Sequence, residues 1–126
     1  MTGRARVLLA EDNQLNRKVI RAYFGVLGIA LDEAHGGFEA LERIETGQYD
    51  LVLMDVQMPG MNGVEVVEAV RQLDMVQPRL VAVTAGAMDG AFDRFIAAGF
   101  DEFLPKPLSL DDLRSLLDRH RVANAA

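Results

Sequence analysis

Four short apolar runs divide the chain, and each is followed by polar residues with reactive side chains. The runs are Val7–Ala10, Leu51–Met54, Leu80–Val83 and, more weakly, Phe103–Leu104. Each is too short for a helix that buries itself, and continuous apolar runs bounded by turn residues are typical of strands covered on both faces. Because stretches with helical periodicity separate the runs, the pattern predicts a parallel sheet with helices on both sides.

Strands and helices are expected to alternate along the whole chain. Gly28 and Gly99 follow two of the expected helices, as helix C-caps commonly do, and Ser109 precedes the last one as an N-cap. The second strand and the helix after it have the weakest pattern. The expected strands are Arg6–Ala10, Ala30–Ala34, Leu51–Asp55, Leu80–Thr84 and Asp101–Leu104, and the expected helices are Gln14–Leu27, Phe38–Glu45, Val64–Leu73, Asp89–Ala98 and Leu110–His120.

Two of the expected helices have a clear apolar face. Apolar residues that recur every three or four positions predict an amphipathic helix. In the last helix these residues are Leu113, Leu116 and Leu117. In the first helix they are Leu15, Val19, Tyr23 and Val26-Leu27.

The polar residues that close the strands are the candidate functional residues. Glu11 and Asp12 follow the first strand, Asp55 and Thr84 end the third and fourth, and Lys106 follows the fifth. Each residue taken alone is more simply a surface or turn residue. In an open parallel sheet, however, ligands bind in the crevice beyond the carboxyl ends of the strands, where all five are expected.

Three of these residues are acidic and predict a metal site. If the first and third strands are neighbours, the carboxylates of Glu11, Asp12 and Asp55 lie within a few ångströms of one another. Like charges at that range raise one pKa sharply unless a cation compensates them. A hard divalent cation, Mg²⁺ or Mn²⁺, suits such a set of oxygen ligands.

The charge of the loaded pocket indicates phosphoryl transfer. Three carboxylates, one divalent cation and the Lys106 ammonium sum to about zero formal charge, so the pocket can accept an anion. In that chemistry Asp55 supplies the attacking carboxylate, Thr84 donates a hydrogen bond, and Lys106 binds a phosphoryl oxygen as a point charge.

Composition limits the class of protein. A chain of 126 residues, half of them hydrophobic, is expected to form a single domain over residues 1–126. It has no cysteine, so a metal would need oxygen ligands. The net charge of −6 disfavours nucleic acid and anionic membranes as partners. The longest apolar stretch, Ala22–Leu31, is half of the ~20 residues needed to span a bilayer, and no signal peptide is recognisable, so we expect a cytoplasmic protein.

Several motifs occur along the chain in a specific order and spacing, although each alone is weak. They are Val7 to Asn13 with Asn16, Tyr49 to Pro59, Asn62-Gly63, Val83-Thr84-Ala85, and Phe103 to Pro107. Together, over essentially the whole chain, they resemble one known family, the receiver domains of two-component response regulators. The first two motifs look most like those of receivers attached to hybrid histidine kinases.

The resemblance implies an α/β fold, a doubly wound five-stranded parallel sheet in the flavodoxin-like order 2-1-3-4-5 with five helices on two faces. It implies a phosphoacceptor in a phosphorelay, not an enzyme, that assists its own phosphorylation and dephosphorylation. The donor would be a phosphohistidine of a histidine kinase or histidine phosphotransfer protein, and Asp55 would be the acceptor.

The resemblance also assigns the remaining site residues. Asp12, Asp55 and the Gln57 carbonyl would bind Mg²⁺, with Glu11 acting mainly through water. Thr84 and Lys106 would bind the phosphoryl group. The peptide bond between Lys106 and Pro107 would be cis.

A conformational switch is implied as well. Thr84 would move toward the phosphoryl group, and Phe103 would turn inward and change the face formed by the fourth helix, fifth strand and fifth helix. That face would bind a downstream protein, with the chain a monomer or a phosphorylation-dependent dimer. Many hybrid-kinase receivers have Asn where this chain has Gly86, so the acyl phosphate would be more open to water here.

Three other functions are compatible with parts of the pattern. A haloacid dehalogenase-type phosphohydrolase needs a second Asp two residues after its nucleophile, where this chain has Gln57. A flavodoxin would bind phosphate after the first strand, where Glu11 and Asp12 would repel it. A phosphorylation-independent binding module on the same fold remains the main alternative.

Overall fold

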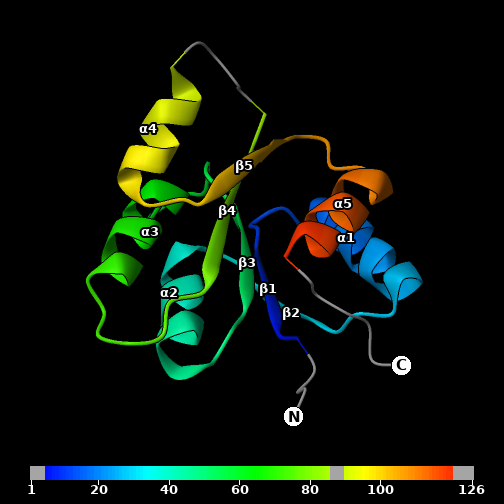
Figure 1. Ribbon diagram of the computed structural model, residues 1–126, viewed down its shortest axis with the longest axis horizontal. Coiled ribbons are helices and arrows are strands. Elements are labelled where there is room, and N and C mark those ends of the chain that lie inside the picture. The colour runs from blue at the N-terminus through cyan, green and yellow to red at the C-terminus, as the bar shows by residue number, and fades with distance from the viewer. Residues whose placement is uncertain (1–4, 86–89, 121–126) are drawn as a thin grey trace.

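The computed structural model describes residues 5–85 and 90–120, and strands and helices alternate throughout (Figure 1). Within this part of the chain, no helix is long and apolar enough to cross a membrane. The strands are β1 (Val7–Ala10), β2 (Leu31–Ala34), β3 (Leu51–Asp55), β4 (Arg79–Thr84) and β5 (Glu102–Pro105). The helices are α1 (Gln14–Leu27), α2 (Gly37–Thr46), α3 (Gly63–Arg71), α4 (Ala91–Ala98) and α5 (Leu110–Arg119).

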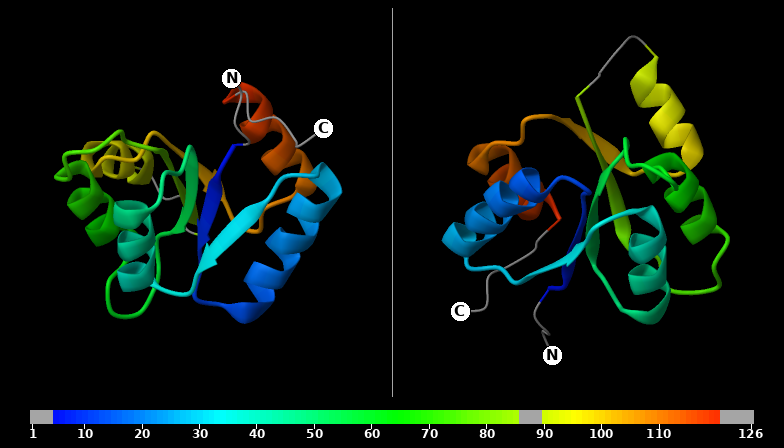
Figure 2. Two further views of the ribbon diagram at one scale, coloured as in Figure 1. Left: turned by 90° about the horizontal axis from the view of Figure 1, so that it is seen from below. Right: turned by 180° about the vertical axis from the view of Figure 1, so that it is seen from behind.

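The five strands form one parallel sheet in the order β2-β1-β3-β4-β5. Helices α1 and α5 lie on one face of the sheet, and α2, α3 and α4 lie on the other (Figures 1 and 2). The doubly wound α/β fold in the flavodoxin-like order is therefore confirmed. The expected elements are all present, with bounds that differ by at most two residues. The first residue of the fourth expected helix, Asp89, lies outside the described residues.

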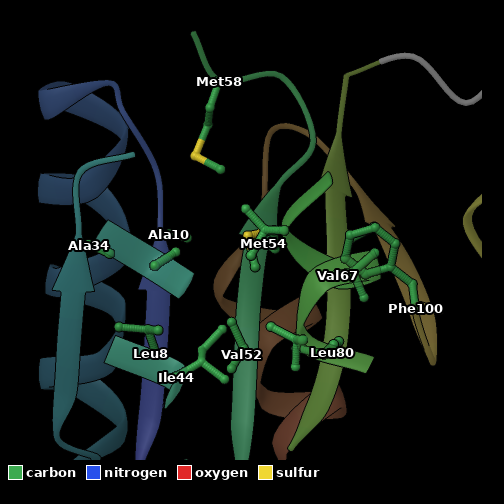
Figure 3. Packing of buried hydrophobic residues seen from close by; sticks show 14 of the residues in the cluster. Leu8, Ala10, Ala34, Ile44, Val52, Met54, Met58, Val67, Leu80 and Phe100 are labelled. Atoms are coloured by element: carbon green, nitrogen blue, oxygen red, sulfur yellow. The ribbon is translucent and has the colours of Figure 1, made fainter. Parts of the chain in front are cut away.

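Successive side chains of each strand point to opposite faces of the sheet, so the core consists of two clusters, one on each face. Leu8, Val52 and Leu80 point to the side of α2, α3 and α4, where Figure 3 shows them packed with Ile44. Residues of the opposite parity, such as Leu9 and Leu53, pack under α1 and α5. Because β1 and β3 are fully buried on both faces, they read as continuous apolar runs without alternation.

The apolar face expected for α1 is confirmed only in part. Tyr23 and Leu27 pack against the core, as expected. Leu15, Val19 and Val26 are exposed, and the buried residues of α1 are Ile20, Phe24 and Arg17. The helix has a second stripe with helical spacing, but an arginine lies in it, and this lowers its apparent hydrophobicity. For α5 the expected face is confirmed, because Leu113, Leu116 and Leu117 are all buried.

Capping boxes stabilise the first turns of α3 and α5. Asn62 accepts a hydrogen bond from the Glu65 backbone, and the Glu65 side chain accepts one from the Asn62 backbone. Ser109 and Asp112 make the same reciprocal pair at α5, as expected for the Ser109 N-cap. Such caps satisfy backbone donors that would otherwise lack partners at a helix start.

Gly63 allows the first turn of α3 to approach the end of β3. A Cβ atom at Gly63 would lie 2.6 Å from the Asp55 carbonyl oxygen and 2.9 Å from the Val56 Cα. Both are backbone atoms, and the Gly63 N–H donates to the Val56 carbonyl at 3.0 Å. The position of Asp55 therefore depends on the absence of a side chain at Gly63.

Gly63→Ala should destabilise the fold, whereas Gly25→Ala should stabilise it. Alanine normally favours a helix over glycine, and a Cβ at Gly25 in α1 would meet nothing within 4 Å, so we expect a gain of about 0.5–1 kcal/mol in the free energy of unfolding there. The backbone clash at Gly63 should reverse the sign and cost about 1–3 kcal/mol. Urea denaturation of both variants checks this, and a gain at both positions would contradict the close approach.

Candidate functional site

The register of the sheet brings the candidate residues to the end of the sheet where the strands finish. Ala10 pairs with Met54, so Glu11 and Asp55 follow neighbouring positions on β1 and β3. On the other side, Thr84 at the end of β4 pairs with Pro105 of β5. This is the carboxyl-terminal end of the strands, from which the β5–α5 connection also begins (Figure 1). The expectation of one shared location is confirmed.

Lys106 forms an ion pair with two buried carboxylates. Its Nζ atom lies 3.1 Å from Glu11 Oε1 and 3.0 Å from Asp55 Oδ2. Glu11 is 2% exposed and Asp55 is 4% exposed. Buried carboxylates are costly unless they are paired and hydrogen-bonded, so the ammonium is essential to this arrangement.

Backbone N–H groups fix the orientation of both carboxylates. The Asn13 N–H donates to Glu11 Oε2, and the Gln57 N–H donates to Asp55 Oδ1, each at 3.1 Å. Each carboxylate thus has one oxygen bonded to the loop that follows its own strand and the other paired with Lys106. The side chains are therefore held in defined orientations before any ligand binds.

The surroundings of Lys106 change the pKa of its ammonium in opposing directions. Burial is the largest single effect and would lower the pKa. Hydrogen bonds and charge attraction from Asp55 and Glu11 act the other way and together prevail, so the pKa of Lys106 is raised above the usual lysine value. Lys106 is therefore a cation at neutral pH.

Asp12 completes an acidic cluster. One carboxylate oxygen each from Glu11, Asp12 and Asp55 lie within 4.8 Å of one another, and Asp12 is exposed whereas the other two are buried. With Lys106 as the neighbouring cation, the cluster keeps two negative charges in excess, which one divalent cation would balance. A donor set made of oxygen atoms, open to solvent on one side, suits Mg²⁺ or Mn²⁺.

Thr84 and Lys106 are joined through the backbone. The Lys106 N–H donates to the Thr84 carbonyl at 2.8 Å, and the Thr84 side chain is buried. The peptide bond between Lys106 and Pro107 is cis, as the resemblance implies. The hydrogen bond to the end of β4 thus fixes the backbone from which the Lys106 side chain extends.

Phe103 packs against α4. Its ring centroid lies 5.1 Å from that of Phe92, in a tilted arrangement, and 6.3 Å from that of Phe95, in an edge-on arrangement. Gly86, for which the resemblance implies faster loss of the acyl phosphate, lies outside the described residues.

A groove extends from the acidic cluster along α1. Its volume is about 420 Å³, and it opens between α1 and the cis-proline turn. Glu11 and Lys106 line one end, and Val19 and Tyr23 line the side along α1. This surface was not expected, because the sequence pattern suggested that Val19 faces the core. Tyr23 lines the groove and also packs against the core cluster, as expected.

Sequence analysis also missed Arg17. It lies on the buried face of α1, 8% exposed, and its Nη1 atom donates to the Glu11 carbonyl at 2.9 Å. The available signal was its position: Arg17, Ile20 and Phe24 lie three, four and seven residues apart, which places them on one side of a helix.

Fold and site together define an α/β domain with an acidic pocket at the carboxyl ends of its strands. The family model described as the response regulator receiver domain matches residues 7–118. The chain belongs to this family. Membership places it in two-component signalling and agrees with the resemblance seen in the motifs. It also argues against the phosphohydrolase and flavodoxin alternatives.

The chain is similar to proteins of very different length. The two-component response regulator ORR41 of Oryza sativa subsp. japonica is 42% identical over 94% of this chain and 95% of its own length. The hybrid signal transduction histidine kinase G of Dictyostelium discoideum is 36% identical over 94% of this chain, which spans 4% of that kinase. The likeness to the kinase therefore concerns a small part of that protein.

A solved structure gives the same picture. The receiver domain of sensor histidine kinase PA1611 from Pseudomonas aeruginosa PAO1, which has a magnesium ion coordinated in its active site cleft, matches with a TM-score of 0.84. It is 30% identical, and the match covers 93% of this chain and 97% of that one.

Proposed function

We propose that this chain is a phosphoacceptor in a phosphorelay, with Asp55 as the acceptor. The observation that carries the proposal is the pairing of buried Asp55 with Lys106 beside Glu11 and Asp12. A carboxylate nucleophile, a fixed cation and a metal-binding cluster are the parts that transfer of a phosphoryl group to an aspartate requires.

The donor is a phosphohistidine of a histidine kinase or histidine phosphotransfer protein. An Asp55 carboxylate oxygen forms a bond to phosphorus while the bond between phosphorus and the imidazole nitrogen breaks. The electron pair of that bond stays on the imidazole, which takes up a proton. The product is an acyl phosphate on Asp55, with the three phosphoryl oxygens retained.

Each neighbouring residue contributes a distinct interaction. The Gln57 N–H orients the Asp55 carboxylate. As the carboxylate loses its negative charge on phosphorylation, the Lys106 ammonium binds a phosphoryl oxygen. Thr84 donates its hydroxyl to another oxygen. Asp12, Asp55 and the Gln57 carbonyl would hold Mg²⁺ or Mn²⁺, with Glu11 acting mainly through water. When bound, the metal neutralises charge on the phosphoryl oxygens.

The output is a change on the face of α4, β5 and α5. As Thr84 moves toward the phosphoryl group, Phe103 turns toward the space it leaves. That rotation gives up the contacts of Phe103 with Phe92 and Phe95, which now bind its ring to α4. A downstream protein that recognises this face would distinguish the two states, in a monomer or a phosphorylation-dependent dimer.

The exposed side of α1 is the proposed docking surface for the phosphodonor protein. Leu15 and Val26 are both 69% exposed, and Val19 links this stripe to the groove that reaches Glu11 and Lys106. A phosphohistidine that approaches Asp55 along the groove would bring apolar side chains of its own helix onto the stripe. Exposed apolar residues grouped beside a site are typical of interaction surfaces.

Incubation with acetyl phosphate and Mg²⁺ should add one phosphoryl group, detected as intact mass. Asp55→Asn should abolish the adduct, because an amide cannot form the acyl phosphate, and chelation of the metal should do the same. Asp74→Asn, a change of the same type at an exposed position, should leave the adduct intact. If no adduct forms with any small-molecule or protein donor, the chain is instead a phosphorylation-independent binding module.

The double variant Leu15→Ala/Val19→Ala should impair transfer from a protein donor and spare transfer from acetyl phosphate. With a phosphorylated histidine phosphotransfer protein that serves the unaltered chain, we expect kcat/KM to fall about 10-fold or more, because central apolar contacts dominate binding. Val76→Ala, at a residue that is 94% exposed and remote from the groove, should change neither rate. Equal losses with both donors, or none with either, would contradict the α1 docking surface.

A further inference from the structure

Arg17 is a buried cation beside the acidic cluster, and the phosphoryl-transfer chemistry gives it no role. Its Nη1 atom donates a buried hydrogen bond to the Glu11 carbonyl at 2.9 Å. The same carbonyl belongs to the peptide group that joins Glu11 to Asp12. Arg17 therefore binds the backbone between two members of the cluster, and in the described part of the chain no hydrogen bond or ion pair joins it to the side chain of either.

A carboxylate on β2 holds Arg17 in this position. Glu33 Oε1 lies 3.7 Å from Arg17 Nε. Arg21, one turn further along α1, binds the same carboxylate through both of its oxygens, at 2.6 and 2.7 Å. Glu33 is largely buried, and these contacts lower the pKa of its carboxyl, the Arg21 hydrogen bond being the largest cause. It is therefore an anion at neutral pH, anchored to α1 at two points.

The backbone of Glu11 is thus fixed on both sides. Its N–H donates to the Ala34 carbonyl at the end of β2 at 3.0 Å, and its carbonyl accepts from Arg17. Asp12 is in a different situation. In residues 5–85 and 90–120, no hydrogen bond or ion pair restrains its side chain, which is exposed. The Asp12 side chain therefore depends for its position on the backbone around it, which Arg17 holds on the Glu11 side and the Asn13 N–H, bonded to Glu11 Oε2, holds on the other.

We propose that Arg17, held by Glu33, is a positioning residue for divalent-cation binding, acting through the Glu11 carbonyl to orient Asp12 toward the cluster. The proposal rests on the proposed function, in which Asp12 is a metal ligand. Groups that orient metal ligands from outside the coordination sphere commonly change metal affinity by about 10- to 100-fold when they are removed.

The charge of Arg17 and its contact with the Glu11 carbonyl predict opposite effects on Mg²⁺ affinity when Arg17 is removed. A cation beside three carboxylates opposes the binding of a second cation, so its removal should tighten Mg²⁺ binding if charge alone mattered. If Arg17 positions Asp12, its removal should weaken Mg²⁺ binding although the pocket becomes more negative. The sign of the change separates the two roles.

The test is calorimetric titration of the apo protein with MgCl₂ for the unaltered chain, Arg17→Met and Arg21→Met. Both variants remove one positive charge that faces Glu33, but only Arg17 contacts the Glu11 carbonyl. We expect Mg²⁺ to bind about 10-fold more weakly to Arg17→Met and within about 2-fold of the unaltered value to Arg21→Met. In Arg17→Met, the Mg²⁺ concentration that half-saturates phosphorylation by acetyl phosphate should rise by a similar factor. The maximal rate at saturating Mg²⁺ should be unchanged.

Arg17→Lys keeps the charge and the aliphatic stem, so it carries the same test if Arg17→Met does not fold. Lysine has a single donor group and cannot reach both Glu33 and the Glu11 carbonyl with the fork geometry of arginine, so weaker Mg²⁺ binding is expected again. Unchanged or tighter binding in the folded Arg17 variant would overturn the positioning role, as would equal weakening in Arg21→Met. If the unaltered chain itself binds no Mg²⁺, the proposed function fails and the role of Arg17 fails with it.

Discussion

The ion pair of Lys106 with Glu11 and Asp55 is the interaction on which the rest of the site depends. Two carboxylates as buried as these would repel each other and lack solvation without a cation between them. The ammonium comes from a segment more than fifty residues from Asp55 in the chain. The pair can form because the parallel strands end together, and the Lys106 side chain reaches from the end of β5 to the residues that end or follow β3 and β1.

The same charges that stabilise the resting site are those that the proposed reaction uses. Acyl phosphate formation removes the negative charge of the Asp55 carboxylate and introduces the charges of the phosphoryl oxygens. Lys106 would then exchange one anionic partner for another without moving far. Around this centre, each loop contributes a backbone restraint: Asn13 and Gln57 orient the carboxylates, and Gly63 lets α3 begin against the end of β3. The site is therefore organised before a ligand arrives.

The fold and the central residues could be predicted from the sequence because their signals are local. Strands buried on both faces appear as short apolar runs, and the topology of parallel sheets carries whatever follows these runs to one edge. The buried face of α1 could be predicted only in part, for Tyr23 and Leu27, because two stripes with helical spacing compete there. The buried stripe contains Arg17, whose charge is balanced by Glu33 on β2, a partner that the sequence pattern alone does not reveal. The exposed stripe of Leu15 and Val19 consequently looked like core.

The most direct test of the central ion pair is a double-mutant cycle of Lys106→Met and Asp55→Asn, measured as free energies of unfolding in urea at neutral pH without divalent cations. If the ammonium compensates the buried carboxylate, Lys106→Met should cost much more with Asp55 present than with Asn in its place. A coupling free energy of about 1–3 kcal/mol is expected for a buried pair in direct contact. Additive effects, within about 0.5 kcal/mol, would contradict the account.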